Sequence, residues 1–373
     1  MSAAPQSPRR ALLLSVSKHY GGTDVRVEQL ARGLEEAGRP YAVAVMSGSE
    51  LHRRLEKDGL RVAPLTAGRG SPALARDIRR LSSGGNIVVD AHQVQSQFWM
   101  LAARGLSRHV PKLATVHSDY ASEQKGRGLR EHVYPRVPKF ATMMGADCVA
   151  VSESVRESLR ATGIPNRRIH LIPNGISDPG PAEPYHFADW PDDAFVVLGV
   201  GRLEHVKGFD LLIDAVAMVS DELPRLRVAI AGDGRARAEL EERIVGRGLS
   251  DRIRLLGFRD DMPRVLAASD VFCMPSRTEG LPYALLEAGM AGLRVVATRV
   301  GGLERLLNHR ATAYLTDPES AESVAEGLRW AATEEAGRVA AAFADYVRTD
   351  FSVETMVART TSLYDGTPSP PGG

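Results

Sequence analysis

Apolar residues fall into short runs separated by helical patterns, and this alternation occurs twice along the chain. In the first half, apolar runs predict strands at 11–17, 41–46, 61–65, 86–90, 112–117, 147–152 and 169–172. Helical spacing of apolar residues marks 25–37, 49–58, 71–82, 93–106, 122–145 and 153–162, and Thr23 or Asp24 is the expected cap of the first helix. Strands that alternate with helices favour a parallel sheet covered on both faces.

Between residues 177 and 194 this alternation stops. The sequence SDPGPAEPYHFADWP (177–191) contains four prolines and few periodic apolar positions, which is typical of a linker. Strand and helix patterns alternate again from 195–201 to about residue 344. We therefore predict an α/β protein of two doubly wound Rossmann-like domains, 1–176 and 195–344, joined by the linker 177–194. Ligands of such sheets bind beyond the carboxyl ends of the strands, so we expect the site in a cleft between the domains.

The composition fits a soluble two-domain protein, but the charge is unevenly divided. The chain has 373 residues, of which 43% are hydrophobic and 25% are charged. The formal net charge is only +1, yet residues 1–180 carry 26 basic and 16 acidic side chains (net +10), and the remainder carries 21 and 30 (net −9). Such an asymmetry indicates an anionic partner for the first half.

Basic residues of the first half cluster in EQKGRGLREHVYPRVPKF (123–140). Apolar residues lie between the cations, which are Lys125, Arg127, Arg130, His132, Arg136 and Lys139. Each cation near an anionic bilayer contributes on the order of 1 kcal/mol, so we expect this segment to dock on an anionic membrane surface. A solvated basic face is the alternative. Nucleic acid is not expected as a partner, because aromatic residues are sparse here.

Cys148 and Cys273 both lie in apolar runs that predict strands. We expect buried free thiols, which suit a reducing cytoplasm, and neither a disulfide nor a metal site. No apolar run approaches the length of a membrane span, and residues 1–10 are interpreted as a disordered tail rather than a signal peptide. The expected location is cytoplasmic, and the basic segment favours peripheral attachment to the inner face of the membrane.

The first candidate chemistry lies in residues 276–292. Glu279 and Gly280 fall in a turn, Pro282 is expected at the first position of a helix, and Glu287 follows on that helix. A glycine permits close approach of a ligand, and free N–H groups at a helix start attract an anion. Carboxylates beside such a helix start suit a sugar joined to a diphosphate. Two glutamates at this spacing also occur by chance, so their assignment to a ligand site depends on the motifs found elsewhere in the chain.

Two cations follow the first strand of the second half, in GVGRLEHVKGFD (199–210). Arg202 and Lys207 lie between a strand and a helix, where a guanidinium fork and an ammonium suit a diphosphate. Chance solvated charges are the alternative. A dinucleotide-binding motif is not formed, because Glu204 stands where its third glycine belongs.

The first half contributes two further candidates. Gly21 and Gly22 follow the first strand and give the backbone room to approach a ligand, while the next helix start adds N–H donors. His117 ends another strand and is expected at the rim of the cleft. An ordinary turn and a structural histidine are the alternatives.

These motifs, in this order, resemble the family-4 retaining glycosyltransferases of GT-B fold. The order is the Gly-Gly turn, the histidine after a strand, IPNGI (172–176), G-R-L-x3-K-G (201–208), AGDG (231–234), E-G-L-P-x4-E (279–287) and G-G-x-E (301–304). The resemblance spans residue 12 to about residue 363. It implies Rossmann-like domains facing across a cleft, and a C-terminal helix of about 345–364 that packs back on the first domain.

The resemblance also implies a role for each matching residue. Arg202 and Lys207 would hold the donor diphosphate, Glu287 the ribose hydroxyls, and Glu279 the donor sugar close to the reacting centre. The histidine would lie beside the sugar at the acceptor face. The implied catalytic residues are His117, Glu279, Arg202 and Lys207, and the implied donor-binding residues are Gly21, Gly22, Arg202, Lys207, Glu279, Gly280, Leu281 and Glu287.

The predicted reaction transfers a hexose-type sugar from a nucleoside-diphosphate sugar, with UDP favoured, to a hydroxyl of a small-molecule, glycan or lipid-linked acceptor. Retention at the anomeric carbon and a role in cell-surface polysaccharide or glycolipid synthesis are implied by the resemblance. No cofactor or metal ion is expected, because the cations and helix starts stabilise the leaving diphosphate. The alternatives are a nucleotide-sugar epimerase of GT-B fold, a non-catalytic sugar-nucleotide-binding protein, a two-carboxylate glycosidase and a nicotinamide enzyme.

Overall fold

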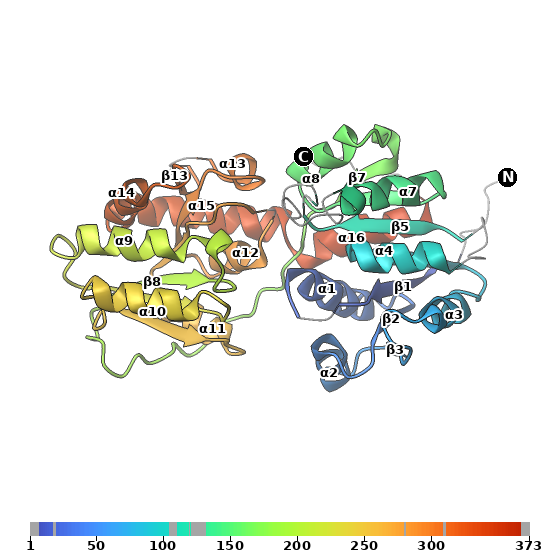
Figure 1. The fold of residues 1–373 in the computed structure, drawn as a ribbon, viewed down its shortest axis with the longest axis horizontal. Coiled ribbons are helices and arrows are strands. Elements are labelled where there is room, and N and C mark those ends of the chain that lie inside the picture. The colour runs from blue at the N-terminus through green and yellow to red at the C-terminus, as the bar shows by residue number, and fades with distance from the viewer. Residues whose placement is uncertain are drawn as a thin grey trace. The chain divides into compact units, whose positions relative to one another are not determined.

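The computed structural model describes residues 7–17, 20–103, 110–118, 120, 132–279, 281–308 and 311–366. The chain divides into two compact units (Figure 1). One reaches to Ser177 and takes in the chain from Ser352 onward, and the other is Asp178–Phe351. Each unit is built on one parallel sheet covered by helices, which confirms the predicted α/β class.

The first unit has a seven-stranded sheet of order β3-β2-β1-β4-β5-β6-β7, with all pairs parallel. All seven predicted strands are present: β1 Arg10–Ser15, β2 Tyr41–Met46, β3 Val62–Leu65, β4 Ile87–His92, β5 Lys112–Val116, β6 Asp147–Ala150 and β7 Ile169–Leu171. Its helical segments are α1 Gly22–Glu36, α2 Glu50–Lys57, α3 Pro72–Leu81, α4 Gln93–Ala102, η1 Tyr134–Arg136, α7 Val137–Met143, α8 Glu153–Ala161, η2 Asn166–Arg168 and α16 Val353–Asp365.

Apolar residues on both faces of this sheet are covered. Leu13 of β1 packs in one cluster with Val27 of α1 and Met356 of α16, whereas Leu12 packs on the other face with Leu74 of α3. Successive side chains of a strand point to opposite faces, so a strand covered on both faces carries a continuous apolar run. This double burial explains why the central strands could be found from unbroken apolar runs.

The start of α1 differs from the expected one. Its cap is Gly21 rather than Thr23 or Asp24, and the helix begins at Gly22. Asp24 is buried in the first turn, where its carboxylate accepts the N–H of Gly21 at 3.2 Å and the hydroxyl of Ser15 at 3.0 Å. The acidic side chain therefore satisfies the helix start from inside the first turn instead of preceding it.

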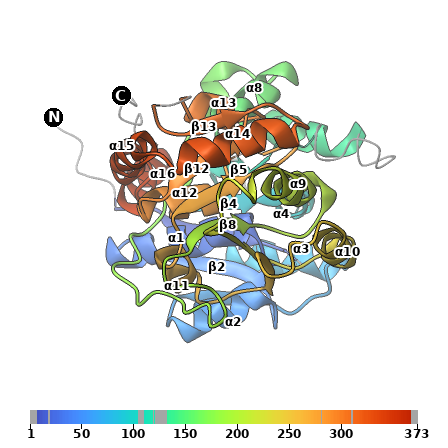
Figure 2. The same cartoon turned by 90° about the vertical axis from the view of Figure 1, so that its left-hand side faces the viewer.

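The second unit has a six-stranded parallel sheet of order β10-β9-β8-β11-β12-β13. Its strands are β8 Phe195–Val200, β9 Leu226–Ala231, β10 Ile253–Gly257, β11 Val271–Met274, β12 Arg294–Thr298 and β13 Tyr314–Thr316. Its helices are η3 His205–Lys207, α9 Phe209–Val219, α10 Arg237–Gly246, α11 Met262–Ala267, α12 Tyr283–Met290, α13 Leu303–Leu306, α14 Ala321–Ala331 and α15 Glu334–Asp350. Helices α9 and α14 pack together, as do α12 and α15 (Figure 2). Pro282 is the residue before α12 rather than its first position.

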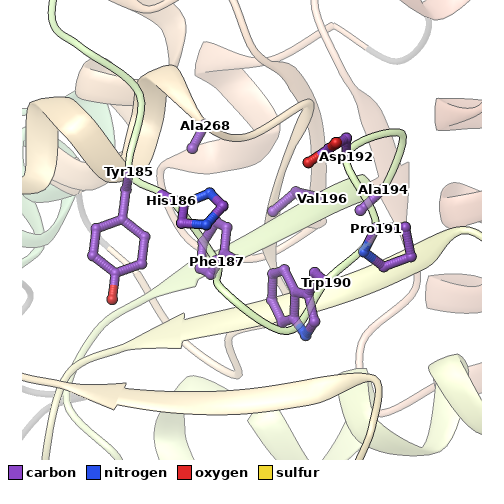
Figure 3. A pocket seen from close by; sticks show the side chains of 9 residues that line it. All are labelled: Tyr185, His186, Phe187, Trp190, Pro191, Asp192, Ala194, Val196 and Ala268. Atoms are coloured by element: carbon purple, nitrogen blue, oxygen red, sulfur yellow. The ribbon is translucent and has the colours of Figure 1, made fainter.

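The chain between 177 and 194 differs from a bare linker, because it belongs almost entirely to the second unit. Phe187 and Trp190 stack at 4.2 Å between ring centroids and line a pocket of about 200 Å³ with Tyr185 and Ala268 (Figure 3). The guanidinium of Arg254 lies 5.3 Å from the Trp190 ring centroid. Prolines indicated the irregular backbone, but the aromatic side chains anchor it.

The C-terminal helical region also differs from the expected single helix of about 345–364. Helix α15 packs on α12 of the second unit, and α16 packs on α1 of the first. The helical conformation is interrupted between them at Ser352, whose hydroxyl accepts the N–H of Thr355 as the cap of α16. Gly175 of the IPNGI motif lets the start of α16 pack closely against the first unit, since a Cβ there would lie 2.7 Å from the Ser352 carbonyl oxygen.

Cys148 and Cys273 are buried free thiols, as predicted. Burial raises the pKa of Cys148 to about 11 and that of Cys273 to about 12, so both are unreactive at neutral pH. Within the described ranges, no helix has the length and apolar character that crossing a membrane requires.

Candidate functional site

Three of the predicted residues of the second unit, Arg202, Lys207 and Glu279, follow the carboxyl ends of its central strands. Strands β8 and β11 are neighbours, and the chain leaves them in opposite directions, towards β9 and towards β12. Ligands of open parallel sheets bind at such a switch point. The loop after β8 carries Arg202 and Lys207, and the loop after β11 carries Glu279.

Glycines allow these loops to approach one another. Gly208, with φ of 66°, lies against the loop after β11, because a Cβ there would be 2.0 Å from the Pro275 carbonyl oxygen. Gly301, with φ of 53°, lies against the same loop, because its Cβ would be 2.1 Å from the Glu279 carbonyl oxygen. Backbone contact therefore fixes the three loops relative to one another.

Lys207 and Glu279 meet as an ion pair. Lys207 Nζ lies 2.5 Å from Glu279 Oε1, and the side chains are 19% and 9% exposed. The hydroxyl of Ser276 donates to the same carboxylate oxygen at 2.7 Å. The structure thus brings together two residues that were predicted from separate segments, and it adds Ser276. An ammonium has three N–H donors, so Lys207 can hold Glu279 and an anionic ligand together.

Arg202 shares the loop of Lys207 but is arranged differently. Its side chain is 68% exposed, and its Nη1 lies 3.3 Å from Glu204 Oε1. Across the described part of the chain, no hydrogen bond or ion pair joins it to Lys207 or Glu279. Its guanidinium is therefore a solvent-facing cation beside the pair rather than a member of it.

Arg277 is a site residue that was not predicted from the sequence. Its guanidinium donates two hydrogen bonds to Asp210 at 2.9 and 2.8 Å, and one to the His205 carbonyl at 2.5 Å. Its backbone N–H also donates to the Val206 carbonyl at 2.8 Å. Burial opposes ionisation of Asp210, but the hydrogen bonds and charge of Arg277 prevail and lower the pKa of that carboxyl. Arg277 therefore clamps the turn that presents Lys207.

Glu287 lies on α12, the helix that follows Glu279. It is partly buried, and burial raises the pKa of its carboxyl. Within the described residues, no hydrogen bond or ion pair involves its carboxylate. Leu281 is buried at the start of the same segment, and Gly280, also predicted, lies outside the described residues. A desolvated carboxylate of this kind is suited to accept hydroxyl hydrogen bonds from a ligand.

Gly21 and Gly22 stand at the carboxyl end of β1 in the first unit. A Cβ at either glycine would meet no atom of the described residues within 4 Å. The Gly21 N–H is already used by Asp24. The next amides of the first turn, at Gly22 and Thr23, have no partner within the helix and are the donors that this turn can offer.

His117 follows β5 and contacts a second histidine. Its Nε2 lies 3.1 Å from Nδ1 of His92, the fully buried last residue of β4. Burial lowers the pKa of His117 well below its ordinary value, and the neighbouring His92 and Arg26 act in the same direction. His117 is therefore a neutral imidazole, which binds by donating and accepting hydrogen bonds rather than by charge.

Of the predicted basic segment, Lys125, Arg127 and Arg130 lie outside the described residues, and His132, Arg136 and Lys139 lie within them. Exposed apolar side chains from two helices gather beside these cations, and this surface was not predicted. We call this surface the α4/α7 face; Phe98, Val133 and Phe140 line it beside His132 and Arg136, and Met143 and Met144 are exposed at the end of α7. A groove of about 520 Å³ runs between α4 and α7 and is lined mainly by apolar atoms.

Comparison with known proteins extends over most of the chain. The family description "Glycosyl transferases group 1" matches residues 186–350, and "Glycosyltransferase Family 4" matches residues 20–178. The chain is 33% identical over 223 residues to a subunit of the human phosphatidylinositol N-acetylglucosaminyltransferase, covering 58% of this chain and 45% of that one. It is 28% identical over 254 residues to 2-deoxystreptamine glucosyltransferase of Streptomyces kanamyceticus, covering 63% and 66%. The matches thus span less than two thirds of these relatives' lengths.

Solved structures share the fold. The Anabaena protein HepE, crystallised in complex with UDP, superposes with a TM-score of 0.82 at 21% identity, covering 96% of this chain and all of that one. Sucrose-phosphate synthase of Thermosynechococcus elongatus superposes with a TM-score of 0.77 at 20% identity, covering 96% and 98%.

Proposed function

We propose that this chain, which belongs to the group 1 glycosyltransferases of GT-B fold, transfers a hexose-type sugar from a nucleoside diphosphate to an acceptor hydroxyl, with retention at the anomeric carbon. The observation that carries the proposal is the Lys207–Glu279 pair, held by Ser276 at the switch point of the second sheet. UDP is the favoured carrier, because HepE was crystallised with UDP. Relatives named for lipopolysaccharide core biosynthesis support an acceptor in cell-surface glycan synthesis.

The proposed chemistry is departure of a diphosphate. The bond between the anomeric carbon and the phosphate oxygen breaks, the acceptor oxygen bonds to that carbon on the same face, and the acceptor proton moves to the leaving phosphate. Lys207 and Arg202 stabilise the charge that develops on that phosphate, so the departure of the diphosphate needs no metal ion. Glu279, oriented by Lys207 and Ser276, contacts the sugar. Glu287 accepts hydroxyl hydrogen bonds from the ribose, and the neutral His117 hydrogen-bonds the sugar.

A thermal-shift screen against UDP, GDP, ADP and TDP tests the donor site. A ligand at about 100 times its dissociation constant adds roughly 2.7 kcal/mol of stability, which the screen can detect. We expect one nucleotide to stabilise the wild type and to lose this effect in Lys207→Ala. Lys57→Ala, an exposed lysine of α2, is the matched control and should respond as the wild type does. An equal shift in all three proteins would contradict the assignment of Lys207.

Turnover distinguishes the proposal from an epimerase and from a non-catalytic sugar-nucleotide-binding protein. The nucleotide-sugar that stabilises the protein is incubated with and without candidate acceptors, and NMR identifies the anomer formed. A retained anomer linked to an acceptor is expected. An inverted product would refute the retaining assignment, a changed sugar released without any acceptor would indicate an epimerase, and binding without turnover would indicate a non-catalytic protein.

The α4/α7 face supports a membrane-bound acceptor as part of the proposal. Phe98 of α4 is 54% exposed, and Phe140 and Met143 of α7 are 62% and 73% exposed. Lys139 lies on α7, and Arg136 ends η1 directly before it. Apolar side chains that enter the boundary of a bilayer, next to cations that attract its anionic lipids, give peripheral attachment.

Flotation with vesicles tests this surface. We expect recovery with anionic vesicles to exceed recovery with neutral ones, and to fall in Phe140→Ser. Phe258→Ser removes a comparably exposed phenylalanine, 70% exposed, from the second unit and should float like the wild type. Equal recovery with both vesicle types would argue against docking.

A further inference from the structure

A buried chain of polar side chains leads from His117 into the core of the first unit. His92 Nδ1 lies 3.1 Å from His117 Nε2, and on the other side of the His92 ring Nε2 lies 3.5 Å from Asp90 Oδ2. Asp90 is 1% exposed and accepts hydrogen bonds from the hydroxyls of Thr115 at 2.6 Å and Tyr364 at 2.8 Å. The Tyr364 hydroxyl comes from α16, so the returning C-terminal helix completes this network.

The position of Asp90 decides which nitrogen of each ring carries the proton. His92 Nε2 is buried and makes no hydrogen bond within the described residues, and the Asp90 carboxylate, 3.5 Å away, is the acceptor that it faces. A bare nitrogen there would set two electron pairs against each other in a buried site, whereas an N–H would point its positive end at a carboxylate. His92 Nε2 is therefore protonated and its Nδ1 is the acceptor. His117 Nε2 must then donate to it, which leaves Nδ1 of His117 as a hydrogen-bond acceptor.

The backbone beside His92 is also unusual. Gln93, the next residue, has φ of 70°, a left-handed conformation that is rare outside glycine. Such conformations cost of order 1–3 kcal/mol and persist where the surrounding structure holds them, often at functional sites. Gln93 begins α4 directly after β4, at the same edge of the sheet as His117, because β4 and β5 are adjacent and parallel.

We propose that Asp90 and His92 are positioning residues that set the tautomer of His117, so that its Nδ1 accepts a hydrogen bond from a hydroxyl of the transferred sugar. This inference rests on the proposed function, in which His117 contacts the sugar. Thr115 and Tyr364 hold the Asp90 carboxylate in place.

Nitrogen-15 NMR of histidine-labelled protein tests the proposal without any substrate. The signals of the pair are assigned from their loss in His92→Asn and His117→Asn. The wild type should show both rings protonated at Nε2. Asp90→Asn is nearly isosteric, but its amide can donate to His92 Nε2. We therefore expect both rings to change to the Nδ1–H form, and kcat to fall roughly 10- to 100-fold because Nδ1 of His117 can then no longer accept the hydrogen bond that the sugar hydroxyl donates. Tyr364→Phe removes a hydrogen bond to Asp90 but keeps its charge, and should leave both tautomers unchanged.

Three results would overturn the proposal: a His117 protonated at Nδ1 in the wild type, an Asp90→Asn variant with unchanged tautomers, or a loss of kcat in Tyr364→Phe as large as in Asp90→Asn. The last result would mean that Asp90 acts through folding alone. If the tautomers change as expected but no nucleotide-sugar supports turnover, the hydrogen-bond network stands and the proposed glycosyl transfer fails, so the two failures are distinguishable.

Discussion

Replacement of Arg277 by glutamine tests whether a mostly buried ion pair holds the turn that presents Lys207. The Arg277 side chain is 13% exposed and that of Asp210 is 18% exposed, whereas Glu319, its other carboxylate partner, is 61% exposed. Removing the guanidinium leaves Asp210 desolvated and without its cation. It also removes the donor to the His205 carbonyl in the Lys207 turn.

The expected loss follows from these exposures. A hydrogen bond to a charged group contributes about 1.5–3 kcal/mol, and an exposed ion pair such as that with Glu319 contributes about 0–1 kcal/mol. We expect the second unit to lose about 2 kcal/mol of unfolding free energy, or roughly 4–8 °C in Tm for a domain of this size. The folded-state pKa of Asp210 is lowered, so its stabilising contribution is present above the pKa of an unfolded aspartate and is lost as pH falls through the folded value. The difference between wild type and variant should therefore be full at pH 7 and shrink below about pH 4.

A double-mutant cycle with Asp210→Asn isolates the pair. Calorimetry of the four proteins at pH 7 should give a coupling energy of at least about 1 kcal/mol, and the affinity for the stabilising nucleotide should fall in Arg277→Gln because the Lys207 turn is loosened. Additive losses, or a Tm difference that persists unchanged at pH 3, would refute the clamp.

Three further predictions follow from the same loops. Gly208→Ala should lower the unfolding free energy, measured by urea denaturation, by about 3 kcal/mol or more, because its Cβ would strike the Pro275 carbonyl. Gly248→Ala, at a similar φ of 68° but with no described atom near its Cβ, should lower it by about 1–2 kcal/mol. Equal losses would contradict the close loop contact. Glu287→Gln should raise Tm at pH 7 and leave it unchanged below about pH 4, because the raised folded-state pKa of Glu287 makes its ionisation destabilise the fold. Titration calorimetry of the same variant should show a nucleotide affinity at least tenfold lower. A lower Tm or an unchanged affinity would argue against an unpartnered ligand-binding carboxylate. Treatment with EDTA should leave the transfer rate unchanged, since Lys207 and Arg202 stabilise the leaving group, and a rate restored only by added Mg²⁺ would disprove metal independence.

The alternation of apolar runs predicted the strands well because the sheets are buried on both faces. Apolar residues in β1 are covered whichever way they point, so the run from Ala11 to Leu14 is unbroken. The limits of α1 could not be predicted in the same way, because they depend on Asp24 meeting Ser15 across the turn. The aromatic anchors of 185–190 and the break at Ser352 likewise depend on what each segment packs against.

The site shows the same division between local and tertiary information. Lys207 and Glu279 could be predicted because each follows a strand and the strands turned out to be neighbours. Arg277 was passed over although it lies two residues before Glu279, because its partner Asp210 is 67 residues away in sequence. His92 ends β4 and His117 directly follows the neighbouring strand β5, and this shared position was the signal that could have identified His92 and, two residues before it, Asp90.

The glycines of the motifs divide into two classes once the loops are seen together. Gly208, Gly232 and Gly301 each lie where a Cβ would come within about 2.1 Å of another loop's carbonyl oxygen, so their role is to let backbones touch. Among the residues that the structure describes, none has an atom within 4 Å of where a Cβ on Gly21 or Gly22 would lie, so packing does not explain these two glycines. A motif glycine that packs against backbone can be tested by stability alone, whereas one that faces open space has to be tested by ligand affinity. By this criterion Gly21 and Gly22 are the glycines to test with a ligand, and Gly208, Gly232 and Gly301 serve to fix the loops that carry Lys207 and Glu279.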